Sequence, residues 1–487
     1  MNKPIRRIVV AVLVLFGALI ANLTYVQFVE ANSLATNPAN SRVLLGEYEH
    51  PRGNIVADQV AIASSKATND RLKYLRTYSQ GQVFAPTTGF YSLVYGPAGI
   101  ERAENSVLAG TDDRLALRRL SDLFTGRDPK GGNVVLTISR KAQETAYEAM
   151  AKQTGAVVAL DPRTGAILAM VSTPSYNPNL LSSHDPDKIR AAYNRLINAP
   201  GDPLLDKAIA QTYPPGSTFK TVIAAAALKA GRTPQTQLQA PTALTLPQTS
   251  HQLHNFDGEQ CGNGQTDSMI DALTISCNTA FAKLGMDLGE KAVRQQAEAF
   301  GIDDQSFQMP LTVAGSSIGD IPSAAALALS SIGQQDVRLT PLQAAMIASA
   351  IANKGELMSP YLVKQIQAPD LTVVDTTKPQ SKGQAVSPKV AGELTTMMKS
   401  VVDNGTGKPA QIPGVQVAGK TGTADNAPGK APHAWFIGFA PANNPKVAVA
   451  VIIEHGGVAG NETTGGLAAA PVGKAVMQAV LSQRGGH

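Results

Sequence analysis

The chain has 487 residues, of which 43% are hydrophobic and 16% are charged, and this composition excludes an intrinsically disordered protein. The length predicts two or three domains. The formal net charge of +5 is spread over the chain with no basic run interleaved with aromatic residues, which argues against nucleic-acid binding.

The N-terminus begins with a short basic segment and continues with a long apolar run. Residues 1–7 carry three basic side chains, and residues 8–29 are mostly apolar. A run of this length can cross a bilayer as one helix, and the basic residues before it predict that 1–7 stay in the cytoplasm. The alternative is a cleaved signal peptide, although its best cleavage site, at 29–31, lies far from the apolar centre. We therefore predict a single-pass anchor in the cell membrane, with the rest of the chain outside the cytoplasm.

A change of character near residue 140 predicts two further domains. Residues 30–140 alternate short strand-like runs with turn signals and contain no catalytic constellation. We interpret them as a small β-rich, non-catalytic module that serves dimerisation or docking. Residues 141–487 have strand-like runs at both ends and alanine-rich helices between them. This order predicts an α+β domain whose antiparallel sheet is assembled from distant segments, with helices packed around it.

The sequence contains only two cysteines, Cys261 and Cys277. Outside the cytoplasm they could form a disulfide, and the alternative is a pair of buried free thiols. The histidines are scattered, so nothing in the sequence resembles a zinc-binding pattern.

The stretch YPPGSTFK at 213–220 places a serine and a lysine one turn apart at the start of a helix-forming run. Positions i and i+3 face the same side of a helix, so Ser217 and Lys220 point into the same space. A serine hydroxyl needs a base near pH 7, and lysine serves where burial and nearby positive charge lower its pKa. The helix N-terminus also favours a developing oxyanion. Alone the motif is weak evidence, since an ordinary capped helix can carry the same letters.

A second motif, TISCNTAF, lies further along the chain and contains Ser276 and Asn278. Ser276 can relay a proton between Lys220 and a leaving amine. Asn278 can hold a substrate amide. The alternative is an ordinary serine and asparagine at a helix end.

A third motif, GKTGTAD, contains Lys420, Thr421, Gly422 and Thr423. Lys420 supplies a second positive charge, which helps to keep Lys220 neutral and attracts a substrate carboxylate. Gly422 has no side chain, so a peptide could lie along this strand as an added β-strand. The alternative is a surface turn, but the three motifs in this order make that interpretation weak.

The order S-x-x-K, S-x-N and K-T-G is the motif set of penicillin-binding proteins and class A β-lactamases. With these motifs the chain resembles a class B penicillin-binding protein, most closely the PbpA type of actinobacteria. The resemblance covers nearly the whole chain and includes RGNIVA at 52–57, GPAGIE at 96–101 and AWFIGFAP at 434–441. After RGNI the family usually has an aspartate and then an arginine, whereas this chain has Ala-Asp-Gln at 57–59. That departure lies outside the catalytic motifs and affects docking.

The resemblance implies a peptidoglycan D,D-transpeptidase without metal or cofactor. Ser217 would attack the penultimate D-Ala of a stem peptide that ends in D-Ala-D-Ala, and Lys220 would accept its proton. The backbone N–H groups of Ser217 and Thr423 would form the oxyanion hole. Thr421 and Thr423 would bind the carboxylate of the departing D-Ala, which Ser276 would help to protonate. A neighbouring stem peptide would then resolve the acyl-enzyme into a cross-link, and β-lactams would acylate the same serine.

The resemblance also implies a fold and a partner. Family members have a membrane anchor, an elongated N-terminal module and a transpeptidase domain in which a five-stranded antiparallel sheet packs between helical layers. They lack a glycan polymerase domain, which implies a polytopic partner of the RodA/FtsW type that docks on the anchor and the N-terminal module. The expected role is cell-wall synthesis in division or in the maintenance of shape.

Three rival interpretations stay open at this point. A β-lactamase would need a deacylating glutamate beyond the S-x-N motif and is usually a shorter, secreted chain. A β-lactam sensor would carry a signalling domain or further membrane spans. A catalytically idle scaffold of the wall-building complex would keep its cellular role after Ser217→Ala.

Overall fold

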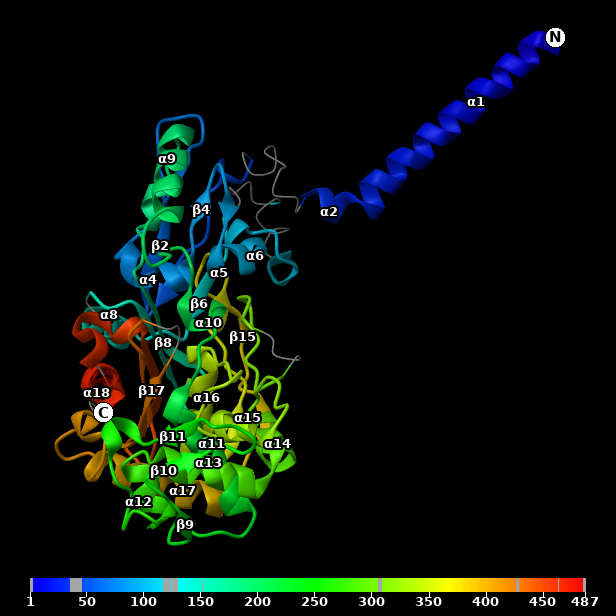
Figure 1. Cartoon of the computed structure of the whole chain (residues 1–487). Helices are drawn as coiled ribbons and strands as arrows, with labels where there is room; N and C mark the ends of the chain where they lie inside the picture. The colour runs from blue at the N-terminus through cyan, green and yellow to red at the C-terminus, as the bar shows by residue number, and fades with distance from the viewer. Residues whose placement is uncertain are drawn as a thin grey trace.

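The computed structural model describes residues 3–35, 46–116, 124, 130–150, 152–304, 309–425, 429–462 and 464–484. The helix α1 (Lys3–Thr24) continues into a π-helical segment (Tyr25–Val29), and together they form a largely apolar span of 27 residues. None of this span is buried against the rest of the protein, and α1 stands apart from it in Figure 1. The span is long and apolar enough to cross a membrane.

The large domain is built on a five-stranded antiparallel sheet in the order β17-β18-β19-β7-β8. The strands are β7 (Gly155–Leu160), β8 (Ile167–Thr173), β17 (Ala418–Ala424), β18 (His433–Ala440) and β19 (Val447–Ile453). Every residue of β7, β8, β18 and β19 is buried. This explains why these strands read as continuous apolar runs. The strand β17, which carries the K-T-G motif, lies at one edge of the sheet.

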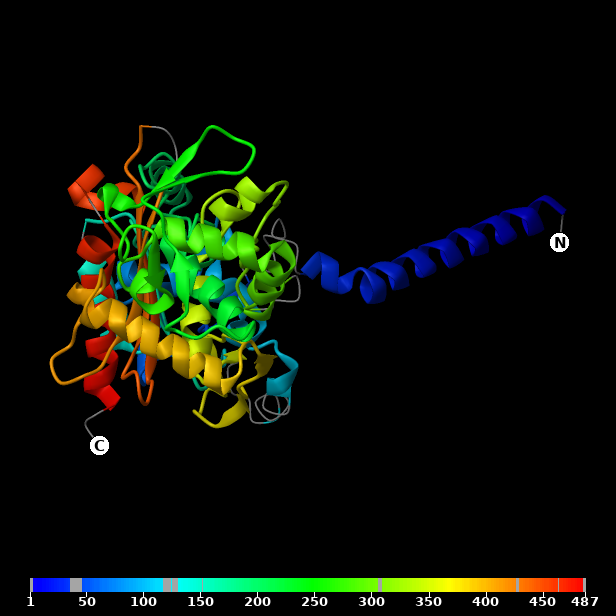
Figure 2. The ribbon, with the colours of Figure 1, turned by 60° about the horizontal axis from the view of Figure 1, so that its bottom comes forward.

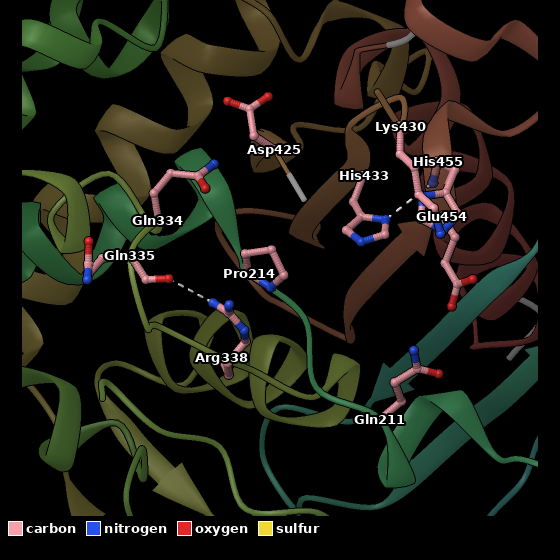
Figure 3. A pocket seen from close by; sticks show the side chains of 10 residues that line it. All are labelled: Gln211, Pro214, Gln334, Gln335, Arg338, Asp425, Lys430, His433, Glu454 and His455. Atoms are coloured by element: carbon pink, nitrogen blue, oxygen red, sulfur yellow. Dashed lines mark hydrogen bonds between the residues drawn. The ribbon is translucent and has the colours of Figure 1, made fainter. Parts of the chain in front are cut away.

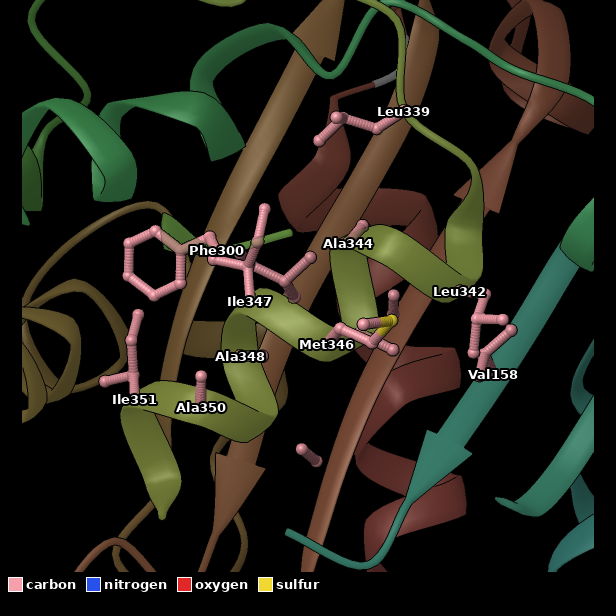
Figure 4. Close-up of a cluster of buried hydrophobic side chains, with 14 of the residues drawn as sticks. Val158, Phe300, Leu339, Leu342, Ala344, Met346, Ile347, Ala348, Ala350 and Ile351 are labelled. Carbon is pink, nitrogen blue, oxygen red and sulfur yellow. The ribbon is translucent and has the colours of Figure 1, made fainter. Parts of the chain in front are cut away.

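Helices cover both faces of this sheet, as the α+β prediction requires. The helices α8 (Arg140–Met150) and α18 (Gly465–Arg484) pack against each other and over one face. The helix α16 (Pro341–Ala352) lies across the other face, and Figure 4 shows it in front of the strands of the sheet. Because side chains alternate along a strand, Val157 belongs to the core under α8 and α18, and Val158 to the core under α16.

A group of helices carries the serine motifs, and Figure 2 shows it gathered at the front of the molecule. Its central helix, α11, has nine buried residues among ten, KTVIAAAALK. A helix that is apolar on all sides is a core helix, and alanine and leucine are strong helix formers. The helices of this group are α11 (Lys220–Lys229), α12 (Met269–Thr274), α13 (Asn278–Leu288), α14 (Glu290–Ala299), α15 (Ala324–Ser330) and α17 (Pro388–Asp403).

A second sheet, in the order β15-β14-β6-β1-β2-β3, uses residues from both sides of the predicted boundary at 140. Four strands belong to the small β-rich N-terminal module, whereas β14 and β15 come from far along the chain and extend the sheet through β6. The sequence pattern does not predict this partnership, because β15 is exposed throughout and does not alternate. The strands are β1 (Ile55–Ala57), β2 (Val60–Ala67), β3 (Tyr74–Tyr78), β6 (Asn133–Leu136), β14 (Val363–Gln367) and β15 (Val373–Thr376).

A buried charge network holds the N-terminal module together. Glu101, which is fully buried, accepts hydrogen bonds from Arg52 Nε at 2.7 Å, Arg76 Nε at 2.6 Å and the Tyr78 hydroxyl at 3.0 Å. Burial opposes ionisation of this carboxyl group, but the charges of Arg76 and Arg52 outweigh it and hold the pKa of Glu101 below its usual value. The network therefore joins the RGNIVA and GPAGIE stretches of the sequence.

Candidate active site

Ser217 lies on a 3₁₀ turn, η4 (Gly216–Phe219), that runs directly into α11. The sequence suggested one helix through Ser217 and Lys220, whereas the α-helix begins at Lys220. In 3₁₀ geometry residues i and i+3 are eclipsed, so the two side chains still share one side of the turn. Ser217 is half-buried and Lys220 is fully buried.

Gly216 allows the serine turn to approach the K-T-G strand closely. Its φ of +53° favours glycine, and a Cβ at this position would lie 2.6 Å from the carbonyl oxygen of Thr423. From the other side, the Gly333 carbonyl accepts a hydrogen bond from the Gly216 N–H at 2.9 Å. The backbones of the serine turn and of Thr423 are thus held side by side. This proximity is needed if the N–H groups of Ser217 and Thr423 are to bind the same oxyanion.

Lys220 is buried next to the second motif. Its Nζ donates to the Ser276 carbonyl oxygen at 2.6 Å and to Asn278 Oδ1 at 2.7 Å. Burial lowers the pKa of Lys220 well below its usual value, and the charge of Lys420 lowers it further. A neutral amine has two N–H donors and one lone pair. Both donors are used by these oxygen atoms, so the lone pair is left to accept a proton from a hydroxyl group.

Ser276 lies between two lysines. Lys420 Nζ donates to Ser276 Oγ at 2.8 Å, and Lys220 Nζ lies 3.4 Å from the same oxygen. Burial lowers the pKa of Lys420 to about 7. Ser276 has a φ of 67°, a conformation that is uncommon for a residue other than glycine and that clusters at functional sites. The three side chains form a continuous path for a proton.

Asn278 is oriented by a residue that the sequence did not single out. Asn255 Oδ1 accepts hydrogen bonds from the backbone N–H groups of Asn278 at 2.9 Å and Thr279 at 3.1 Å. It therefore satisfies the first N–H groups of α13, the task of an N-cap. The side chain of Asn278 donates to the His254 carbonyl oxygen at 3.2 Å. An N-cap 23 residues away from its helix has no sequence signature.

A disulfide joins Cys261 and Cys277, whose Cα atoms are 6.1 Å apart. Cys277 lies between Ser276 and Asn278 in the chain, and both cysteines are buried. The bond ties the turn of the second motif to the loop that follows Asn255. It thereby restrains the side chains around Lys220.

Gly422 packs against the serine turn. A Cβ at Gly422 would lie 2.9 Å from the Pro215 carbonyl oxygen and 2.9 Å from Thr218 Cγ2. The missing side chain thus makes room for the turn, a reason that the sequence analysis did not give. Trp435, which pairs with Gly422 across the sheet, donates from Nε1 to the Pro214 carbonyl oxygen at 3.0 Å. This hydrogen bond fixes the entry to the serine turn.

The threonines of the third motif differ in their surroundings. Thr421 is buried, and its hydroxyl oxygen lies 2.6 Å from that of Thr406, a residue that no motif indicated. Thr423 is half-buried at the edge of the sheet beside Gly216. The carbonyl oxygen of Thr421 accepts from Lys420 Nζ at 2.9 Å. All three motifs therefore meet where the serine turn packs against β17.

Comparison with known proteins identifies the family that the three motifs indicated. Residues 155–478 match the penicillin-binding protein transpeptidase domain, and residues 52–134 match the penicillin-binding protein A dimerisation domain. The chain is 49% identical to peptidoglycan D,D-transpeptidase PbpA of Mycolicibacterium smegmatis, over 99% of this chain and 100% of that protein. It is also 49% identical to PbpA of Mycobacterium tuberculosis, over 99% of each.

Solved structures of penicillin-binding proteins also superpose on this chain. Penicillin-binding protein A from M. tuberculosis as a ceftriaxone acyl-enzyme superposes with a TM-score of 0.87 at 49% identity, over 90% of this chain and 100% of that one. Its penicillin G acyl-enzyme gives 0.85, over 89% of this chain and 100% of that one. The chain therefore belongs to the penicillin-binding protein transpeptidases, and within them to the PbpA-like class B members. The resemblance predicted from the three motifs is confirmed.

Proposed function

We propose that this chain is a membrane-anchored serine D,D-transpeptidase, which cross-links peptidoglycan stem peptides through an acyl-enzyme on Ser217. One observation carries the proposal: Lys220 Nζ lies one turn from Ser217, is buried so that its pKa falls well below the usual value, and donates to two oxygen atoms of the second motif. The names of the relatives and the acyl-enzyme complexes of penicillin-binding protein A support it.

In the acylation step, Ser217 Oγ attacks the carbonyl carbon of the penultimate D-Ala, and its proton passes to Lys220 Nζ. The N–H groups of Ser217 and Thr423 receive the charge that develops on the carbonyl oxygen, where the loss of one donor costs about 3 kcal/mol. The C–N bond then breaks as Ser276 passes a proton to the departing amine. Lys220 Nζ, 3.4 Å from Ser276 Oγ, then gives that oxygen the proton it took from Ser217 and is neutral again. Lys420 keeps its charge and holds Ser276 Oγ through the hydrogen bond at 2.8 Å.

The carboxylate of the departing D-Ala binds at the third motif. Lys420 supplies the positive charge, and Thr421 and Thr423 supply hydroxyl donors. An amine of a neighbouring stem peptide then attacks the ester on Ser217, and its proton passes to the neutral Lys220. The ester C–O bond breaks as Lys220 gives this proton to Ser217 Oγ. Attack by water instead gives a carboxypeptidase side activity. A β-lactam acylates the same serine and leaves slowly.

The proposal extends to the place and partner of the reaction. The span at 3–29 anchors the chain in the cell membrane, and the basic residues before the apolar core favour a cytoplasmic N-terminus. A disulfide beside the site suits an oxidising compartment outside the cytoplasm. A glycan polymerase of the RodA/FtsW type supplies the strands, and its docking surface is the anchor and the N-terminal module. The role is cell-wall synthesis in division or shape maintenance.

The test uses the full-length chain in detergent with uncross-linked glycan strands made from a lipid-linked precursor. After digestion, mass spectrometry counts cross-linked stem-peptide dimers. We expect dimers from the wild type and a loss of at least about a thousandfold in Ser217→Ala, because removal of a nucleophile has an effect of this size. Cross-linking by Ser217→Ala at the wild-type rate would refute the assignment. A folded wild type that neither cross-links nor reacts with benzylpenicillin would favour the scaffold.

A further inference from the structure

Asn255 follows β11 (Gln252–His254) on a loop that leads toward the second motif, and its side chain is only 6% exposed. Its Oδ1 accepts from the backbone N–H groups of Asn278 at 2.9 Å and Thr279 at 3.1 Å, and its Nδ2 donates to the Glu259 carbonyl oxygen at 3.0 Å. Two N–H donors require an oxygen at that position. The amide therefore has one orientation, with both of its ends engaged.

This loop holds Asn278, and Asn278 in turn contacts the amine of Lys220. The His254 carbonyl oxygen accepts from Asn278 Nδ2 at 3.2 Å, so Asn278 Oδ1 is turned toward Lys220 Nζ, which lies 2.7 Å away. Asn255 thus fixes the backbone of Asn278, while the residue before it fixes the side chain. Asn278 is therefore the link between Asn255 and the amine that accepts a proton in the proposed mechanism.

Lys220 has no negatively charged partner among the residues that the structure describes. Burial and the charge of Lys420 are the causes that lower its pKa. Its Nζ faces uncharged groups, namely the Ser276 carbonyl oxygen, Asn278 Oδ1 and the ring of Phe281, whose centroid is 5.9 Å away. Four charged side chains line a cavity of about 370 Å³ beside the serine turn, which Figure 3 shows, but none of them is among the causes of the shift. They are Arg338, Asp425, Lys430 and Glu454.

An aspartate is as good an N-cap as an asparagine, so the capping of α13 alone does not explain an asparagine at position 255. A carboxylate there would place a full negative charge beside Asn278, close to the buried amine of Lys220. An opposite charge within about 4–6 Å raises the pKa of an amine by about one to three units. The acidic side chains of the same loop, Asp257 and Glu259, are exposed to solvent, which weakens their effect on a buried group.

We infer that Asn255 is a positioning residue for the transpeptidase reaction, which caps α13 without adding a negative charge and so keeps the amine of Lys220 both in place and neutral. Asn255 does not touch the reacting atoms, and it acts through Asn278. The inference goes beyond the capping itself, because it requires the cap to be uncharged. It rests on the proposed function, because it concerns the base that takes the proton of Ser217.

The test measures how acylation by benzylpenicillin depends on pH in the full-length chain in detergent, for the wild type, Asn255→Asp and Asn255→Ala. The aspartate accepts from the same N–H groups, so Asn255→Asp should melt at or above the wild-type temperature. The rising limb of its pH–rate profile should move by about one unit to higher pH, which lowers the rate on that limb about tenfold. Asn255→Ala removes the cap and adds no charge. Its melting temperature and its maximal rate should therefore fall, while the rising limb keeps its pH.

The matched control is Ser387→Asp, which puts the same charge at the N-cap of another helix. Ser387 is exposed and caps α17 by accepting from the Val390 N–H at 3.3 Å. The second motif is approached by the opposite end of α17, where the Thr274 hydroxyl donates to Ser400 Oγ at 2.8 Å. Ser387→Asp should therefore keep the stability of the wild type and leave the pH–rate profile unchanged.

A rising limb that stays at the wild-type pH in a folded Asn255→Asp overturns the inference, and the transpeptidase assignment stands. An equal shift in Ser387→Asp also overturns it, because the change in net charge would then explain the result. If Asn255→Asp does not fold, the inference is wrong as well, since the loop would need an amide for reasons unrelated to Lys220. If benzylpenicillin does not acylate the folded wild type at all, the proposed function itself fails.

Discussion

Trp435→Phe tests whether one buried hydrogen bond positions the nucleophile. The change removes the donor to the Pro214 carbonyl oxygen, a bond of 3.0 Å from a side chain with 0% exposure. The lost hydrogen bond contributes about 1 kcal/mol, and the smaller ring leaves a void that costs roughly another 1 kcal/mol. We therefore expect the free energy of unfolding to fall by about 2 kcal/mol.

The catalytic effect should exceed what this loss of stability explains. Without its anchor the serine turn can shift, and a displacement of about 1 Å at a reacting group can cost about a hundredfold in rate. We expect the second-order rate constant for acylation by benzylpenicillin, measured by stopped-flow or intact mass, to fall about ten- to a hundredfold. Phe436→Leu is the matched control: Phe436 is buried on the same strand but packs in the core under α18.

This control should lower the melting temperature by a similar amount and keep the acylation rate within about twofold, because its packing defect lies on the other face of the sheet. The reasoning is refuted if Trp435→Phe loses stability but acylates at the wild-type rate. It is also refuted if Phe436→Leu slows acylation as much as Trp435→Phe does.

Three further predictions follow from the buried charges and the disulfide. The acylation rate should rise with pH as Lys220 loses its proton, and it should fall again near pH 7 as Lys420 loses the charge that attracts the carboxylate. Arginine keeps its charge at that pH, so the decrease should move to higher pH in Lys420→Arg. A pH–rate profile of Lys420→Arg that still decreases near pH 7 would contradict the assignment. Glu101→Gln should destabilise the N-terminal module by about 3–5 kcal/mol, because it leaves two buried arginines without their negative partner. Since the pKa of Glu101 is depressed, its contribution to stability is present at neutral pH and is lost in acid. Urea titrations at several pH values can check this. Cys261→Ser should lower stability by about 3 kcal/mol and slow acylation, and an unchanged rate would show that the disulfide does not restrain the second motif.

The motif side chains could be predicted from the sequence because each motif is local. Ser217 and Lys220 are one turn apart, and Ser276 and Asn278 flank one helix start, so spacing alone indicates which side chains share a side. The strands β7, β8, β18 and β19 could be predicted for a similar reason, since fully buried strands read as short apolar runs, whereas the number of five strands came from the family resemblance.

The remaining parts of the site depend on partners that are distant in the sequence. Asn255 caps a helix from a loop, and Thr406 meets Thr421 only after the chain has folded. Trp435 is the only tryptophan in the chain and stands in a quoted motif, but no pattern says that it bonds to Pro214. The joining of β14 and β15 to the N-terminal sheet is hidden for the same reason: exposed strands carry no alternation that indicates a partner.

The most direct test of the account is the site of acylation by benzylpenicillin. The full-length chain in detergent is mixed with the drug and examined by intact mass and peptide mapping. The account predicts one adduct per chain, on the peptide that contains Ser217, which persists for many minutes and is absent from Ser217→Ala. An adduct that clears within seconds would indicate a β-lactamase. An adduct on another residue, or none on a folded protein, would contradict the assignment of Ser217 as the nucleophile.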